Sequence, residues 1–140
     1  MASNPSHMLD TNAIIAIRRH RPASVSARLA AMPVGSVVMS AVTYGELLYG
    51  VAKSADPLGG KAVLQRLARD IPVLGIGTDE AEHYGDIRSH LAVKGMMIGA
   101  NDLWIAAHAR SLGVVLVSGN LGEFARVPGL TVEYWTAGAS

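Results

Sequence analysis

Short apolar segments that run directly into helical sequence recur along this chain, and three of the junctions carry an acid. Asp10 follows the apolar residues Met8 and Leu9, and Glu46 and Asp102 stand in similar surroundings. In an open α/β sheet, ligands usually bind beyond the carboxyl ends of the strands. We therefore expect these three carboxylates, which are far apart in the sequence, to lie together at that edge.

Residue patterns predict helices that alternate with brief strands. Helices are expected over 12–19, 23–32, 43–54, 61–70, 78–94 and 102–112, and strands over 36–40, 71–76, 114–117 and 130–135, after a short first strand before Asp10. A loop or a short turn of helix is expected over 119–124. The strand over 114–117 shows no polar alternation, which is typical of a parallel sheet covered on both faces. Strands separated by helices form βαβ units, so the sequence predicts an α/β fold with a parallel sheet.

Length and composition narrow the class of protein. The 140 residues are expected to form one domain over 8–135, with 1–7 as a leader or disordered start and 136–140 as a tail. A net charge of +1 neither demands nor excludes a nucleic-acid partner. The chain has no cysteine, which rules out disulfides and thiolate metal sites and makes a reducing cytoplasm the simplest location. No apolar run reaches the roughly 18 residues that a membrane span requires.

The residues alone leave two interpretations of the acids open. In the first, the three carboxylates bind Mg²⁺ or Mn²⁺, since hard cations prefer oxygen ligands, and Asn120 supplies a neutral fourth group. Two carboxylates about 4 Å apart repel by about 4 kcal/mol at an effective dielectric constant of about 20, so three of them need a cation or a retained proton. In the second interpretation, Asp10 and Asp102 cap helices, and Glu46 forms a capping box with Thr43.

Four segments, taken in order, resemble the PIN-domain ribonucleases and, more narrowly, the VapC-type toxins of bacterial toxin–antitoxin pairs. These segments are 8–12, 40–51, 98–109 and 116–120, the last followed by Glu123 and Phe124. The resemblance implies a three-layer α/β/α fold with a central parallel sheet. It also implies Mg²⁺- or Mn²⁺-dependent endonucleolytic cleavage of RNA, typically transfer or ribosomal RNA, a VapB-like antitoxin as partner and a homodimer.

The resemblance also implies roles for individual residues. Asp10, Glu46 and Asp102 match the acidic metal-binding positions of the family, and Asn120 matches a fourth position that is often Asp or Asn. Glu123 stands where some members have an additional acid. Polar positions around the site are matched by Asn12, Ser40, Thr43 and Asn101. A threonine and an arginine that are common in the family are missing from 118–124, so any phosphate contact of that arginine does not carry over.

Other features leave alternatives open. The basic residues Arg18, Arg19 and Arg21 could contact RNA phosphates, or they could form a solvated helix end that is favourable to the helix dipole. His108 lies in an apolar helix and is predicted to be a core histidine. An apolar groove beside the first two helices is the expected place for a partner helix. The alternative to a nuclease is a non-catalytic module of the same fold that binds RNA or an antitoxin.

Overall fold

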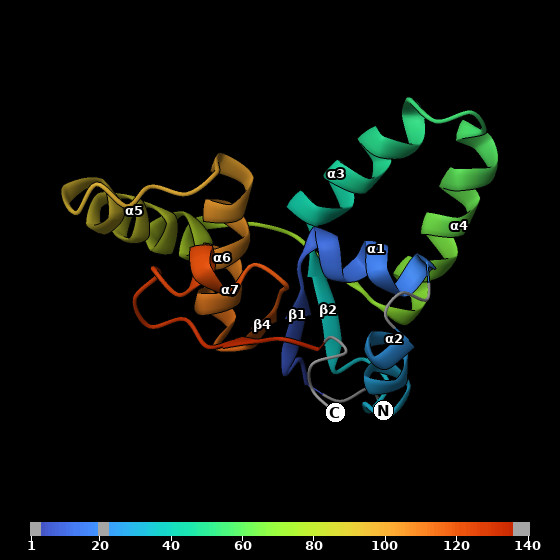
Figure 1. The fold of residues 1–140 in the computed structure, drawn as a ribbon, viewed down its shortest axis with the longest axis horizontal. Helices are drawn as coiled ribbons and strands as arrows, with labels where there is room; N and C mark the ends of the chain where they lie inside the picture. The colour runs from blue at the N-terminus through green and yellow to red at the C-terminus, as the bar shows by residue number, and fades with distance from the viewer. Residues whose placement is uncertain (1–3, 20–22, 136–140) are drawn as a thin grey trace.

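The computed structural model describes residues 4–19 and 23–135, whose strands form one five-stranded sheet in the order β3-β2-β1-β4-β5 (Figure 1). Every neighbouring pair of strands is parallel. The first strand of the chain is therefore the central strand of the sheet, and Met8 lies beside both Val38 and Leu116. The strands are β1 (His7–Leu9), β2 (Val37–Ser40), β3 (Val73–Leu74), β4 (Val115–Val117) and β5 (Val132–Glu133).

Helices connect the strands and cover both faces of the sheet, as the three-layer prediction requires. In Figure 1, α1 to α4 gather on one side of the strands, and α5 to α7 gather on the other. In the part of the chain that the structure describes, the helices are α1 (Thr11–Arg19), α2 (Ala23–Ala30), α3 (Ala41–Ala52), α4 (Pro57–Asp70), α5 (Thr78–Val93), α6 (Ala100–Leu112) and α7 (Leu121–Phe124). Among them, none is both long and apolar enough to cross a membrane.

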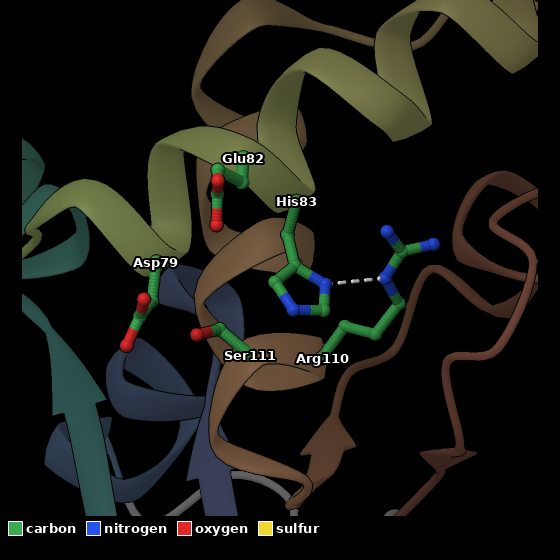
Figure 2. Close-up of a pocket in the computed structure, with 5 residues that line it drawn as sticks. All are labelled: Asp79, Glu82, His83, Arg110 and Ser111. Atoms are coloured by element: carbon green, nitrogen blue, oxygen red, sulfur yellow. Dashed lines mark hydrogen bonds between the residues drawn. The ribbon is translucent and has the colours of Figure 1, made fainter.

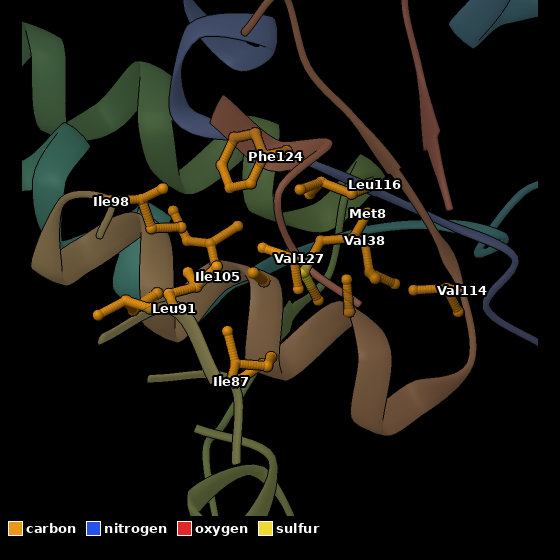
Figure 3. Close-up of a cluster of buried hydrophobic side chains, with 14 residues drawn as sticks. Met8, Val38, Ile87, Leu91, Ile98, Ile105, Val114, Leu116, Phe124 and Val127 are labelled. Atoms are coloured by element: carbon orange, nitrogen blue, oxygen red, sulfur yellow. The ribbon is translucent and has the colours of Figure 1, made fainter. Parts of the chain in front are cut away.

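Adjacent residues of the central strands point to opposite faces of the sheet, and each face has its own core. Met8 and Leu116 belong to the core formed with α5 and α6, which Figure 3 shows. Their neighbours Leu9 and Val117 belong to the core formed with α1, α3 and α4. Because both faces are covered, these strands are apolar throughout, and the prediction of an α/β/α fold is confirmed.

Several helix and strand boundaries differ from the sequence prediction, and the largest shift at a helix start, that of α4, has an identifiable cause. β1 begins at His7, one residue before the predicted start of the domain. Helix α4 begins at Pro57, within a segment that the sequence predicted as a turn, because Asp56 caps it: the Asp56 Oδ1 accepts a hydrogen bond from the Gly59 amide at 3.1 Å. Helix α3 begins two residues earlier than predicted, at Ala41.

The contribution of α4 to the core can be tested with two leucines on that helix. Leu64 is 0% exposed, whereas Leu58 is 85% exposed. We expect Leu64→Ala to lower the free energy of unfolding by about 2–5 kcal/mol, because it leaves a cavity. The matched control, Leu58→Ala, should change it by no more than about 0.5 kcal/mol. Urea denaturation followed by circular dichroism measures both, and equal losses would show that α4 does not pack as described.

Candidate active site

Asp10 lies at the carboxyl end of the central strand β1 and is only 4% exposed. Its Oδ1 accepts a hydrogen bond from the Ala13 amide at 2.9 Å, so Asp10 caps α1. Burial raises the pKa of Asp10. Hydrogen bonds from the Ser118 hydroxyl and the Ala13 amide lower the pKa, and the charge of Glu46 raises it. The cap interpretation is therefore correct for Asp10, but the same carboxylate also interacts with a second acid.

Glu46 reaches the site from α3 and bonds to a different helix. Its Oε1 accepts a hydrogen bond from the Thr11 hydroxyl at 2.5 Å, and the Thr11 Oγ1 lies 3.5 Å from the hydroxyl of the buried Thr43. The predicted capping box of Thr43 and Glu46 is wrong, because Ser40 caps α3 through a bond from the Val42 amide at 3.1 Å. With the start of α3 capped in this way, the Glu46 carboxylate is free to turn toward α1.

Asp102 lies in the first turn of α6, where its charge interacts with those of the other acids. Burial, followed by the charge and hydrogen bond of Glu123, raises the pKa of Asp102 to about 7, and the charges of Asp10 and Glu46 add to the rise. The Glu123 Oε1 accepts a hydrogen bond from the Gly99 amide at 3.0 Å. Gly99, and not Asp102, is the cap residue of α6, so the cap interpretation is wrong for Asp102.

Asn120 caps the short helix α7 and orients Glu123. Its Oδ1 accepts a hydrogen bond from the Glu123 amide at 3.4 Å, and its Nδ2 donates to the Glu123 carboxylate. The Asn120 amide donates to the Ser118 Oγ at 2.9 Å. Asn120 therefore acts on the site through two neighbouring residues. Glu123 accepts a hydrogen bond from the Gly99 amide, close to Asp102, and Ser118 bonds to Asp10.

The other predicted polar residues lie around this cluster in different ways. Asn101 lines a cavity of about 730 Å³ together with Thr11 and Glu46. Asn12 lines a separate cavity of about 140 Å³ beside Ser118. Ser40 is fully buried, and its Oγ lies 2.8 Å from the Nδ1 of the equally buried His108. Asn101 therefore lines the same cavity as Glu46, whereas Ser40 lies buried in the fold.

Two of the basic residues that the sequence predicted as possible RNA contacts lie beside a groove. Arg18 and Arg19, in the last turn of α1, line a cavity of about 570 Å³ whose other walls come from α3 and α4. Glu46 lines the same groove at its other end, next to Thr11. Arg21 lies outside the described residues, so its predicted contact with RNA stays a prediction.

Sequence reasoning missed the roles of Thr11 and Ser118. Ser118 directly follows β4, and its hydroxyl bonds to Asp10 at the end of the neighbouring strand. The signal was available, because a polar residue that ends a buried parallel strand lies at the same edge as the other strand ends. No comparable signal identifies Thr11 as the partner of Glu46, since that bond depends on how α1 and α3 pack.

The donor set matches the chemistry of a hard divalent cation. Asp10, Glu46, Asp102 and Glu123 offer carboxylate oxygens, and within the described ranges none of the four forms an ion pair with a basic side chain. A proton held near neutral pH on Asp102 is the expected response to burial beside unneutralised carboxylates. Among the described residues, however, no three acids or histidines already stand close enough to hold one ion together. Side-chain movement would be needed for three of them to coordinate an ion directly.

A separate polar pocket of about 340 Å³ lies between α5 and α6. Figure 2 shows its lining residues: Asp79, Glu82, His83, Arg110 and Ser111. Arg110 donates to the His83 Nδ1 at 2.8 Å and to the Asp86 carboxylate at 2.7 Å. Bonds and charge from Arg110 hold the pKa of Asp86 below its usual value. Arg110 thereby ties the two helices together, and none of the four clustered acids lines this pocket.

Comparisons with known proteins agree with this geometry. The PIN domain family matches residues 7–130, which include all four acids. The chain is 40% identical to Ribonuclease VapC2 of Haemophilus influenzae over 92% of this chain and 97% of that protein, and 42% identical to the tRNA(fMet)-specific endonuclease VapC of Shigella flexneri over the same shares. Among solved structures, DNA-bound VapBC from Salmonella typhimurium is similar with a TM-score of 0.89 and 38% identity, over 94% of this chain and 99% of that one.

The raised pKa of Asp102 predicts how stability depends on pH. In the folded protein Asp102 titrates at about 7, against an ordinary value of 3.8. The folded state therefore binds more protons than the unfolded state between these values, and stability falls as pH rises through this window. We expect the Tm of metal-free protein to fall between about pH 5 and pH 8, and Asp102→Asn to flatten this fall. Asp70→Asn, at an exposed acid, is the control. A wild-type Tm that rises over the same interval would contradict the prediction.

Proposed function

The chain belongs to the PIN-domain family, and on that premise we propose that it is an endoribonuclease that hydrolyses phosphodiester bonds of RNA with a divalent metal ion, as the toxin of a VapBC-type pair. The family predicted from the four sequence segments is confirmed by the match over residues 7–130. The relatives named as ribonucleases and a tRNA(fMet)-specific endonuclease support RNA as the substrate. Transfer or ribosomal RNA is the proposed class, and the cytoplasm is the proposed location, since such RNA is found there.

One observation supports the metal above all others: burial and the three neighbouring carboxylates together raise the pKa of Asp102 to about 7. Mg²⁺ or Mn²⁺ would relieve this repulsion, and when bound it supplies an acidified water molecule and positive charge near the phosphate. Asp10, Asp102 and Glu46 would hold the ion. Thr11 orients Glu46 through its 2.5 Å hydrogen bond, and Ser118 orients Asp10.

The groove between α1, α3 and α4 is the proposed binding site for the antitoxin. Its walls include the apolar side chains of Ile15, Leu47 and Val63, and Arg18 and Arg19 lie at one end. An amphipathic helix buries its apolar face in a groove of this kind. Solved VapBC complexes that are similar to this chain support an antitoxin partner. This groove adjoins the first helix but is completed by α3 and α4. A separate cavity of about 370 Å³, lined by Ile17 and Leu29, lies beside the first and second helices, where the sequence predicted a groove. The homodimer stays a prediction.

A non-catalytic binding module is the second candidate function. It is favoured by one observation: among the described residues, no three ligands already stand at coordination distance. The two candidates differ in whether RNA is cut, and the following two experiments separate them.

Asp10→Asn tests the central acid. Asparagine can still cap α1, so we expect the fold and its Tm to persist. RNA cleavage should fall by a factor on the order of 10² or more, because one charged ligand of the proposed ion is lost. The measurement is single-turnover cleavage of labelled structured RNA. Asp56→Asn makes the same change at an acid that caps α4 outside the site, and it should cleave like the wild type. Full activity of Asp10→Asn would remove Asp10 from the mechanism.

Metal removal tests the dependence on a divalent ion. We expect EDTA to stop cleavage of the same RNA, and excess Mn²⁺ or Mg²⁺ to restore it, because the carboxylates alone supply no positive charge to the phosphate. Fragment lengths resolved on a denaturing gel distinguish internal cuts from degradation at an end. Cleavage that continues undiminished in EDTA would contradict the metal-dependent mechanism. No cleavage in any metal would favour the binding module.

A further inference from the structure

A buried hydrogen bond joins the segments that carry Glu46 and Asp102. The Nδ1 of His108, on α6, lies 2.8 Å from the Oγ of Ser40, at the end of β2. His108 is 1% exposed and Ser40 is 0% exposed, so water does not compete for this bond. A buried polar group that loses its partner carries a desolvation penalty, so the two residues hold each other in place. The sequence predicted His108 as a core histidine, but it did not identify this partner.

The same Ser40 hydroxyl also fixes the start of α3. Its Oγ accepts a hydrogen bond from the Val42 amide at 3.1 Å. The hydroxyl keeps its own proton and a second lone pair for His108, so it can bond the Nδ1 in either neutral tautomer of the ring. Burial lowers the pKa of His108 and favours the neutral form, while Glu80, whose charge acts on the ring from α5, opposes that shift. One hydroxyl thus connects β2, the first turn of α3 and the middle of α6.

This connection lies close to both acids along the chain. Glu46 is six residues after Ser40, and Asp102 is six residues before His108. Six residues of helix span about 9 Å, so a shift of α6 at His108 is transmitted directly to Asp102. The beginning of α6 is anchored to α5 by the stacking of Trp104 on Tyr84 and to α7 by Glu123, which accepts a hydrogen bond from the amide of the cap residue Gly99. The bond of His108 adds a polar contact between α6 and the start of α3.

We propose that His108 is a positioning residue for the acidic site: by bonding Ser40, it sets the placement of α6 against the start of α3, and therefore the separation of Asp102 from Glu46. The proposal rests on the proposed metal-dependent function. If His108 only filled space in the core, its substitution would lower the stability of the fold but would not change the affinity of the folded protein for the ion.

The test compares substitutions at His108 with a buried control on the same helix. His108→Leu removes the ring nitrogen that bonds Ser40, whereas His108→Asn keeps a polar atom near the position of Nδ1. Ile105→Val, at a residue that is 0% exposed, removes only apolar contact.

Calorimetric titration gives the Kd for Mn²⁺, and RNA cleavage gives kcat and KM. We expect His108→Leu to raise the Kd about 10- to 100-fold and to lower kcat without changing KM. His108→Asn should recover most of the affinity, and Ile105→Val should bind like the wild type.

A double-mutant cycle and a spectrum of the wild type complete the test. In a Ser40→Ala background, His108→Leu should weaken Mn²⁺ binding no further, because the bond is already absent. The ¹⁵N spectrum of wild-type His108 should show a hydrogen-bonded Nδ1, and this measurement requires neither a variant nor a metal. An Nδ1 without a hydrogen bond, or a Kd of His108→Leu equal to that of Ile105→Val, would overturn the positioning role, whereas RNA cleavage by the wild type would leave the proposed function intact. A wild type that neither binds Mn²⁺ nor cuts RNA would overturn both.

Discussion

The mutual repulsion of carboxylates at one edge of the sheet is the constraint on which the site depends. Burial raises the pKa of Asp102, Glu123 raises it further through its charge and a hydrogen bond, and the charges of Asp10 and Glu46 add to the rise. The protein tolerates this repulsion because neutral donors hold three of the four acids: the Ala13 amide bonds Asp10, the Thr11 hydroxyl bonds Glu46, and the Gly99 amide bonds Glu123. Neutral donors fix the position of a carboxylate without cancelling its charge, so the site keeps its attraction for a cation.

The sheet places these acids by simple geometry. Its strands are short and parallel, so their carboxyl ends lie at one edge. The side chains on each face of the sheet pack into a separate core. Asp10 ends the central strand and Ser118 follows the neighbouring one, which brings the two side chains into hydrogen-bonding contact. Glu46 and Asp102 come from helices instead, and the relative position of those helices is set by packing and by the buried pair of Ser40 and His108.

The sequence predicted what local patterns determine and failed where distant segments meet. Apolar strands separated by helices were sufficient to predict the parallel sheet, and acids at the junctions predicted which carboxylates share the site edge. The start of α4 was missed because Asp56 followed by proline and glycines is typical of a turn, although Asp56 here caps a helix. The bond between Thr11 and Glu46 was not predictable, because it exists only once α1 and α3 have packed together.

The position of β1 at the centre of the sheet has a consequence for biosynthesis. This strand is the first to be translated, yet it pairs with β4, more than a hundred residues later in the chain. Glu123, which accepts a hydrogen bond from the Gly99 amide close to Asp102, lies even later in the chain. Because domains fold as units during synthesis, a chain still attached to the ribosome cannot complete its acidic cluster until α7 has emerged. The central strand is thus made early, and the cluster at its carboxyl end is completed by the segments translated much later.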